Sequence, residues 1–402
     1  MGVAKTPEGN EPALGRWGAA AAVDRGTIVR FLIILGLLLV ALFGLPSFFG
    51  ADWITIFTSV AIYAIAAAGF GILYGRVGMI SLGQVALLSI GCWIGTRLAY
   101  ATSIPFPFLL IITGAITMLI GVLVGLPALR LSGLYLALIT LMFAGATTIV
   151  LSQIDFPNGG PGFTGRSATG ALTTETPPVR RPDWGTSDNA YYRYVVIVAA
   201  ILFLLALVHV AAKPGRAWAS IRESEPAALA AGVNITLYKL WAFALASFMT
   251  GVAGCLLAAQ IGVPRAITFQ TQDSLTLAAT ALIGGIFSLW GALVAGIFNQ
   301  LLPFIFQAQW GVDSNFLLVV FGAGLVQVLL TAPGGLIDQF PKDMANLGRL
   351  IARKVPLTRQ AAFGIGSILA LLLGIVILIT VSPLVGVIVV ILSPVLAAYS
   401  VN

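Results

Sequence analysis

The stretch GRAWASIRESEPAALAAGVN (residues 215–234) separates two long apolar runs, residues 192–211 and 237–261. It carries charges of both signs, yet its alanines and its proline predict two short helices. Pro226 suits the first turn of the second helix, where a missing N–H costs no hydrogen bond. Gly232 then provides a helix stop. An ordinary solvated loop is the alternative interpretation, but such a loop would not need alanine and glycine at these places.

The composition of the whole chain excludes a water-soluble protein. Of its 402 residues, 59% are hydrophobic and 9% are charged, and the mean hydropathy is +1.03. Such a chain cannot bury its apolar residues in one core and still present a polar surface, so we expect it to lie in a lipid bilayer. The 45 glycines fit this environment, because small residues let membrane helices approach closely.

Uncharged runs of about 20 residues mark the expected spans, because that length crosses a hydrocarbon core of about 30 Å. We expect an all-α polytopic integral membrane protein with about ten transmembrane helices and a C-terminal helical hairpin. The expected helices are residues 29–45, 53–74, 79–99, 106–127, 133–152, 192–211, 237–261, 275–289, 291–309 and 315–332, with 361–381 and 384–400 forming the hairpin. Residues 275–309 are either two spans or one re-entrant segment.

Loops and charged segments divide the chain into four parts. They are an N-terminal cytoplasmic segment (1–28), a transmembrane domain (29–340), a basic cytoplasmic linker (341–360) and a hydrophobic hairpin (361–402). Within the transmembrane domain lie an external loop (153–191) and an inner loop (213–236). The external loop contains FPNGGPGFTG, whose glycines and prolines predict a tight turn rather than a helix. It is either a plain linker or a docking loop.

The distribution of basic residues predicts the orientation. Cytoplasmic loops retain lysine and arginine, and most of the 21 basic residues lie on the inner side if ten spans alternate from a cytoplasmic N-terminus. Both termini are then cytoplasmic. The net charge of +7 follows from this bias, so we expect no nucleic-acid partner. A cleaved signal peptide is the alternative for the first 50 residues.

Residues that could carry enzymatic chemistry are scarce. The chain has one histidine, His209, near the inner end of a predicted span, where an interfacial residue is expected and a proton relay is the alternative. No lysine follows a glycine, so a P-loop for ATP is excluded, and no HExxH or CxxC pattern occurs. Cys92 and Cys255 lie inside predicted spans and are expected to pack as small apolar residues without a disulfide. We therefore expect a protein that is not an enzyme and holds no metal or cofactor.

Charged residues are also missing from mid-membrane depth. Ion-coupled carriers and channels usually place costly acidic or basic groups there, whereas the interior polar residues of this chain are mild ones such as Thr140 and Gln327. The energy for any transport should then enter from outside the bilayer. A self-sufficient channel or secondary carrier remains the alternative class.

Several motifs resemble one transporter family. The segment EPAALAAG (225–232) looks like the Glu-Ala-Ala and glycine motif in the cytoplasmic loop of ATP-binding-cassette (ABC) importer permeases, and 215–254 resembles its branched-chain amino acid version. The further matching segments are GRVGMISLGQVALLSIG (75–91), LRLSGLYLALITL (129–141), NGGPGFTG (158–165), GGIFSLWGALVAG (284–296) and TAPGGL (331–336), which look like the LivM-type subunit. The resemblance covers residues 29–340 and not the C-terminal extension.

The resemblance implies a heteromeric importer in the bacterial cytoplasmic (inner) membrane. Its partners would be a second, LivH-like permease, two ABC ATPase subunits that bind ATP-Mg, and an extracytoplasmic solute-binding protein. The inner loop would be the coupling loop that docks on an ATPase subunit. The implied docking residues are Arg222, Glu223, Glu225, Ala227, Ala228 and Gly232. The chain departs from the family at Pro226, which stands between the glutamate and the alanine pair, and at Gln84, where relatives have histidine.

A weak internal similarity suggests an inverted repeat. SLGQVALLSIG (81–91) and SLTLAATALIGG (274–285) are alike and lie five spans apart, an offset that reverses direction across the membrane. This predicts a 5+5 arrangement with the pathway near the repeat interface. The candidate pathway residues are Ser81, Gln84, Thr280 and Gly284. We expect an importer permease for branched-chain or related amino acids, with urea or short-chain amides as the alternative substrates.

Overall fold

The computed structural model describes residues 34–129, 133–157, 160, 178–309, 314–331 and 334–337. These residues are helical throughout, apart from the turns and loops that connect the helices. The chain divides into two compact units, Met1–Phe49 and Gly50–Asn402. In the first unit, an apolar helix over Ile34–Phe48 contains a π-helical turn, Val40–Gly44, and ends as α2, Leu45–Phe48.

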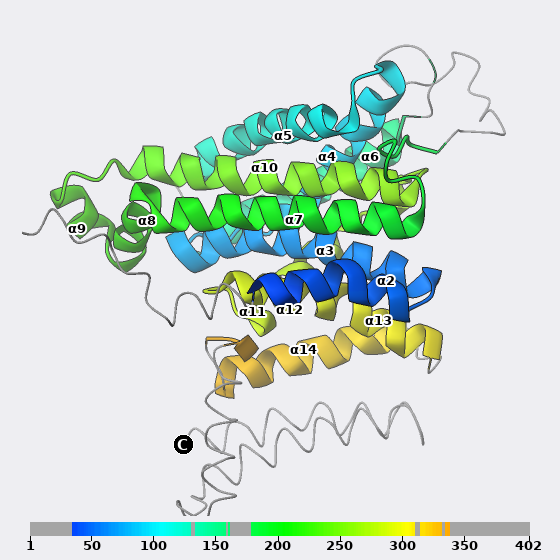
Figure 1. Cartoon of the computed structure of the whole chain (residues 1–402). Helices are drawn as coiled ribbons and strands as arrows, with labels where there is room; N and C mark the ends of the chain where they lie inside the picture. Colours follow the sequence, from blue (N-terminus) through cyan, green and yellow to red (C-terminus); the bar gives the residue numbers. More distant parts are fainter. Residues whose placement is uncertain are drawn as a thin grey trace, which may run out of the picture. The chain divides into compact units, whose positions relative to one another are not determined.

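The second unit holds the remaining helices (Figure 1). In chain order they are α3 (Ala51–Phe70) with the π-helical η2 (Gly71–Val77), α4 (Gln84–Ala101), α5 (Phe106–Ala128), α6 (Leu134–Ile154), α7 (Asp188–Ala211), α8 (Lys213–Glu223), α9 (Glu225–Ala230), α10 (Ile235–Ile261), η3 (Ala266–Thr268), α11 (Thr271–Gly284), α12 (Leu289–Gly296), η4 (Ile297–Leu301), α13 (Leu302–Phe304), η5 (Ile305–Gln309) and α14 (Ser314–Thr331).

Six helices of the described part are long and apolar enough to cross a membrane. They are Ala51–Val77, Phe106–Pro127, Leu134–Ile154, Asp188–Ala211, Ile235–Ile261 and Leu289–Gln307. The polytopic helical class is therefore confirmed, whereas the expected count of ten spans is not. The apolar helices Ile34–Phe48 and Phe321–Leu330 are shorter, and the expected hairpin 361–402 lies outside the described residues.

The core of the second unit is built around α10. In the most apolar 18-residue stretch of α10, 89% of the residues are buried. This helix packs against α3, α4 and α5. Small residues permit this close approach: a Cβ atom placed on Gly254 would collide with the carbonyl oxygen of Leu88 in α4. Glycines therefore bring these helices together without large interlocking side chains, as is common between membrane helices.

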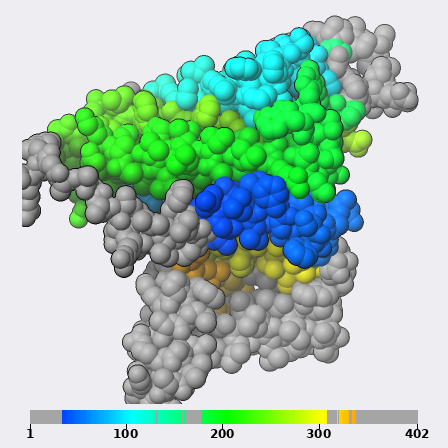
Figure 2. Space-filling model, viewed as in Figure 1, coloured from blue at the N-terminus to red at the C-terminus, as the bar shows by residue number. Residues whose placement is uncertain are grey.

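The outer helices expose apolar side chains instead. On α6, Leu134, Tyr135 and Met142 are each about 70% exposed, and α7 exposes Ile201 and Leu204 in a similar way. Figure 2 shows the side chains of α7 spread over one face of the molecule. Exposed apolar area of this extent is unusual in a water-soluble protein and fits contact with lipid.

Two of the predicted spans have different bounds in the structure. The span expected at 79–99 begins as a helix only at Gln84, because Gly78 has a left-handed φ of 85° and ends η2. The span expected at 275–289 is α11, which ends at Gly284 before Gly285 with a φ of 117°. At 14 residues, α11 is about 21 Å long and shorter than the hydrocarbon core.

Candidate functional site

The polar segment between α7 and α10 forms two short helices, as the sequence predicts. Pro214 lies in the first turn of α8, and Pro226 in the first turn of α9. A single residue, Ser224, separates them: it ends α8, and its Oγ accepts a hydrogen bond of 3.4 Å from the backbone N–H of Ala227. Figure 1 shows α8 and α9 together beyond one end of α7 and α10.

The segment ends in a tight turn at Gly232. This residue has a φ of 81°, which glycine adopts without strain. The Val233 N–H donates to the carbonyl of Ala228 at 3.0 Å, and the Gly232 N–H donates to that of Leu229 at 2.9 Å. These bonds satisfy helix-end carbonyls. Asn234 then caps α10 by accepting from the N–H of Leu237 at 3.0 Å.

One face of α8 and α9 is anchored to the bundle. Trp218 is fully buried and its Nε1 donates to the carbonyl of Tyr238 at 2.8 Å. The ammonium of Lys239 lies 2.6 Å from the Glu225 carboxylate, with 7% and 49% of the two side chains exposed. Ala228 is buried as well. Of the predicted docking residues, Glu225 and Ala228 therefore bind the segment to its own chain.

The opposite face is a small, weakly charged surface that we call the tip, comprising Glu223, Ala227 and 229–232. All its residues are exposed, and Leu229 is 64% exposed. A Cβ atom added at Gly232 would meet nothing within 4 Å. The tip therefore offers open space and short side chains against which another surface could pack closely.

Arg222, predicted to lie on the docking surface, has its guanidinium directed into the bundle. Its Nη1 donates to the carbonyl of Gly75 at 2.9 Å, and its Cζ lies 4.3 Å from the ring centroid of Phe287. The second contact is a cation–π interaction. Arg222 thus connects α8 to η2 and to the loop between α11 and α12.

Arg76 reaches the same loop from η2. Its Nη2 donates to the carbonyl of Phe287 at 2.7 Å. The backbones are equally close, since a Cβ atom on Gly75 would collide with the carbonyl oxygen of Ile286. We call Gly75, Arg76, Arg222 and Phe287 the arginine junction. It joins three segments that are distant in the sequence.

The loop between α11 and α12 is held by glycines. A Cβ atom on Gly284 or on Gly291 would collide with the backbone of the other side of this turn. Gly335, with a φ of 85°, packs against Gly285 so closely that it also has no room for a Cβ. Three of the motifs singled out in the sequence, 75–91, 284–296 and 331–336, therefore meet around this loop.

The predicted pathway residues are buried, and they line neither of the two cavities described for this part of the chain. Ser81 and Gln84 are 2% exposed and Thr280 is fully buried. The Gln84 Oε1 accepts from Thr250 Oγ1 at 2.8 Å, whereas its Nε2 has no partner in the described part of the chain. Thr280 donates to a carbonyl of its own helix. The 81–91 stretch begins α4, and the 274–285 stretch ends α11, so the inverted repeat stays a prediction.

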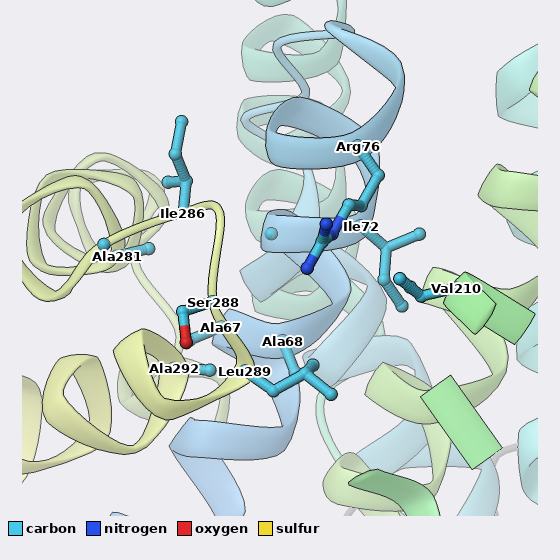
Figure 3. Close-up of a pocket in the computed structure, with 12 residues that line it drawn as sticks. Ala67, Ala68, Ile72, Arg76, Val210, Ala281, Ile286, Ser288, Leu289 and Ala292 are labelled. Atoms are coloured by element: carbon cyan, nitrogen blue, oxygen red, sulfur yellow. The ribbon is translucent and has the colours of Figure 1, made fainter. Parts of the chain in front are cut away.

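A small cavity lies between α3, α7 and the loop that joins α11 to α12 (Figure 3). Its volume is about 10 Å³, roughly the space for one water molecule. Alanine, glycine and aliphatic side chains line most of it, and Ser288 and Arg76 supply polar groups. Figure 3 shows the Arg76 guanidinium directed into this space. The cavity is thus a small, mostly apolar space with one cation at its edge.

Sequence reasoning alone missed how the arginine junction forms. Arg76 and Phe287 both lie in the quoted motifs, but nothing in the sequence indicated that they touch. Trp218 and Lys239, the anchors of α8 and α9, were also missed. Two signals in the sequence could have indicated them: Trp218 is a lone tryptophan in a charged segment, and Lys239 is a lysine within an apolar run.

Comparison with known proteins now places the chain. The family model described as branched-chain amino acid transport system, permease component, matches residues 53–329. The chain belongs to this permease family. It is 27% identical over 332 residues to the high-affinity branched-chain amino acid transport system permease protein LivM of Salmonella typhimurium, covering 79% of this chain and 77% of LivM. LivM of Escherichia coli matches with the same identity and coverage. No match was found among solved structures.

The permease family accounts for the main features of the fold. A multi-pass membrane protein with apolar helices is what a transport permease requires, and the described residues contain no group of three or more histidine, cysteine or acidic side chains that could hold a metal. Cys92 and Cys255 are buried free thiols. Of the predicted external loop (153–191), the structure describes residues 153–157, 160 and 178–191.

Proposed function

We propose that this permease is the transmembrane subunit of an ABC importer that moves branched-chain or related amino acids across the bacterial cytoplasmic membrane. ATP hydrolysis in partner subunits drives the transport. Membership of the branched-chain amino acid permease family is the observation that carries the proposal. Apart from Lys239, the polar residues of the core are uncharged. Lys239 is the single charge of α10 and lies near its start. This composition is consistent with energy supplied from outside the bilayer.

The proposed complex holds two permeases and two ATPase subunits, with a solute-binding protein outside. The second permease is LivH-like, and ATP-Mg binds only to the ATPase subunits. Both termini and the α8–α9 segment face the cytoplasm in this arrangement. The tip suits docking because its residues are exposed and, apart from Glu223 and Leu229, small. A groove on an ATPase subunit can approach its backbone closely.

The proposed route of motion runs from the tip through Arg222. Closure of the ATPase pair would displace α8 and α9, which Ser224 joins without a flexible linker. Arg222 transmits the displacement to Gly75 and to Phe287, because it contacts both. The loop between α11 and α12 borders the small cavity. Two packings of this region would then open and close the path, in the way that packed helices switch between discrete states.

The proposed path passes the buried polar side chains of Ser81, Gln84 and Thr280 and the buried Gly284. The unpartnered Gln84 Nε2 offers a hydrogen bond to a passing zwitterion. The description of the matching family, a branched-chain amino acid transport system, favours amino acids over urea and short-chain amides.

Substitution of Gly232 tests the docking role of the tip. Gly232→Trp fills open space on the isolated permease, so its cost there is the strain of a left-handed φ, about 1–2 kcal/mol. Gly232→Ala carries the same strain without the bulk and is the matched control. We expect both variants to insert in the membrane, and only the tryptophan variant to lose amino-acid uptake and ATPase binding.

Two results would contradict the proposal. Equal uptake by the tryptophan and alanine variants would remove the tip from the docking surface. Amino-acid flux through the purified permease alone, reconstituted without ATPase subunits, would favour a channel or secondary carrier instead.

A further inference from the structure

A second, larger cavity lies between α8, η2 and the end of α7. Its volume is about 580 Å³. One face of α8 lines it with Gly215, Arg216, Ala219, Arg222 and Glu223, and the other walls are Gly75, Arg76 and Val210. The opposite face of α8 carries the buried Trp218. The cavity thus lies on the side of α8 that faces away from Trp218, and Arg222 is the α8 side chain that crosses to its far wall at Gly75.

The lining of this cavity has an excess of positive charge. Arg76, Arg216 and Arg222 face one carboxylate, that of Glu223, which leaves a net charge of +2. Within the described residues, none of the three arginines forms an ion pair with a carboxylate. Arg76 and Arg222 also repel each other electrostatically. Guanidinium groups match the geometry of phosphate oxygens, so an anion would offset this repulsion.

The cavity stands where two membrane-spanning helices end. Val210 is the penultimate residue of the span Asp188–Ala211, and Arg76 is the penultimate residue of Ala51–Val77. The ends of spans lie at the depth of lipid headgroups. Basic pockets between helices at this depth are suited to acidic headgroups. The position therefore favours a lipid over a soluble anion.

An apolar stripe on α7 runs toward the cavity. Ile197, Ile201, Leu204 and Val208 follow the three- and four-residue spacing of one helix face, and their exposures are 42%, 59%, 61% and 56%. Val208 is two residues before Val210, which lines the cavity. The green surface of α7 lies open on one face of the molecule in Figure 2. An acyl chain could lie along this stripe while its headgroup reaches the arginines.

We propose that this cavity binds the phosphate group of an anionic phospholipid, held by Arg76, Arg216 and Arg222, with an acyl chain along the exposed stripe of α7. The bound lipid neutralises the charge between the end of the bundle and α8. It thereby joins α8 to the surrounding bilayer. This site adjoins the tip at Glu223, which belongs to both, and its occupancy does not depend on which substrate the permease carries.

Lipid retention by the purified full-length permease tests the site. The probes are phosphatidylglycerol and phosphatidylcholine with identical acyl chains, added in detergent and counted by native mass spectrometry, with inorganic phosphate as a competitor. We expect phosphatidylglycerol to be retained and phosphatidylcholine not. Arg216→Gln should weaken retention about tenfold, the effect of losing one hydrogen bond to a charged group. Arg216 is exposed, so this variant should fold.

Two further variants make the test specific. Arg216→Lys keeps the charge but not the fork of donors, and we expect a smaller loss than with glutamine. Arg265→Gln removes an exposed arginine beyond the other end of α10 and should retain lipid as the parent does. Equal retention of both lipids, or no effect of Arg216→Gln, would overturn the proposal. Displacement of phosphatidylglycerol by inorganic phosphate at millimolar concentration would make this a site for free anions instead.

Discussion

Arg222→Gln should uncouple ATP hydrolysis from transport if the arginine junction transmits motion. The substitution removes the 2.9 Å hydrogen bond to Gly75 and the guanidinium 4.3 Å from the Phe287 ring. A hydrogen bond to a charged group contributes about 1.5–3 kcal/mol, and partial exposure of Arg222 favours the lower end. A cation–π contact at an exposed position adds about 0.5–1 kcal/mol. The sum is about 2 kcal/mol.

This energy predicts the size of the effect. At 1.4 kcal/mol for each factor of ten, about 2 kcal/mol corresponds to roughly a 30-fold loss of coupling. The assay is amino-acid uptake per ATP hydrolysed by the complete transporter in proteoliposomes. We expect the Arg222→Gln complex to assemble and hydrolyse ATP while its uptake per ATP falls by up to that factor.

Matched variants separate the two contacts. Phe287→Leu removes only the ring, so we expect a loss of about two- to fivefold. Its effect should not add fully to that of Arg222→Gln, because both disrupt one contact. Lys213→Gln removes an exposed charge at the start of α8 and is the control. Unchanged uptake per ATP in Arg222→Gln, at normal assembly, would refute this route of coupling.

Three other substitutions probe the anchors and the core. Glu225→Gln leaves the nearly buried Lys239 without its carboxylate, so it should destabilise the purified permease by about 1–3 kcal/mol. Lys239→Met should destabilise it less. Thermal unfolding in detergent compares the two variants, and a larger loss of stability in Lys239→Met would contradict the reasoning. Gly254→Ala should lower the unfolding temperature, because its Cβ would collide with the Leu88 carbonyl, and equal stability would show that α4 and α10 can move apart. Trp218→Phe removes one hydrogen bond, so it should lower the stability of the permease by about 1 kcal/mol and increase proteolytic cleavage at α8. Unchanged cleavage would show that other contacts hold α8.

The sequence predicted the membrane class and the two short helices because both depend on local signals. Apolar runs of span length identify α5, α6, α7 and α10 within a few residues. Proline in a first turn and glycine at a stop locate α8 and α9, since those effects act on the backbone nearby.

Tertiary contacts decided what the sequence left open. The start of α4 is displaced to Gln84, where the Leu82 N–H donates to the Thr140 hydroxyl at 2.8 Å rather than to a helical carbonyl. The inward direction of Arg222 depends on Phe287, which lies 65 residues later in the chain. Neither pairing has a local signature, so a single sequence could identify these residues but not their roles.

The single residue between α8 and α9 has a mechanical consequence. Ser224 both ends one helix and caps the next, so the backbone torsions of a single residue set the angle between the two helices. The turn at Gly232, between α9 and α10, is then the other place where the direction of the segment can change. In the proposed mechanism, a force on the tip would therefore rotate α8, and the arginine junction would receive that rotation.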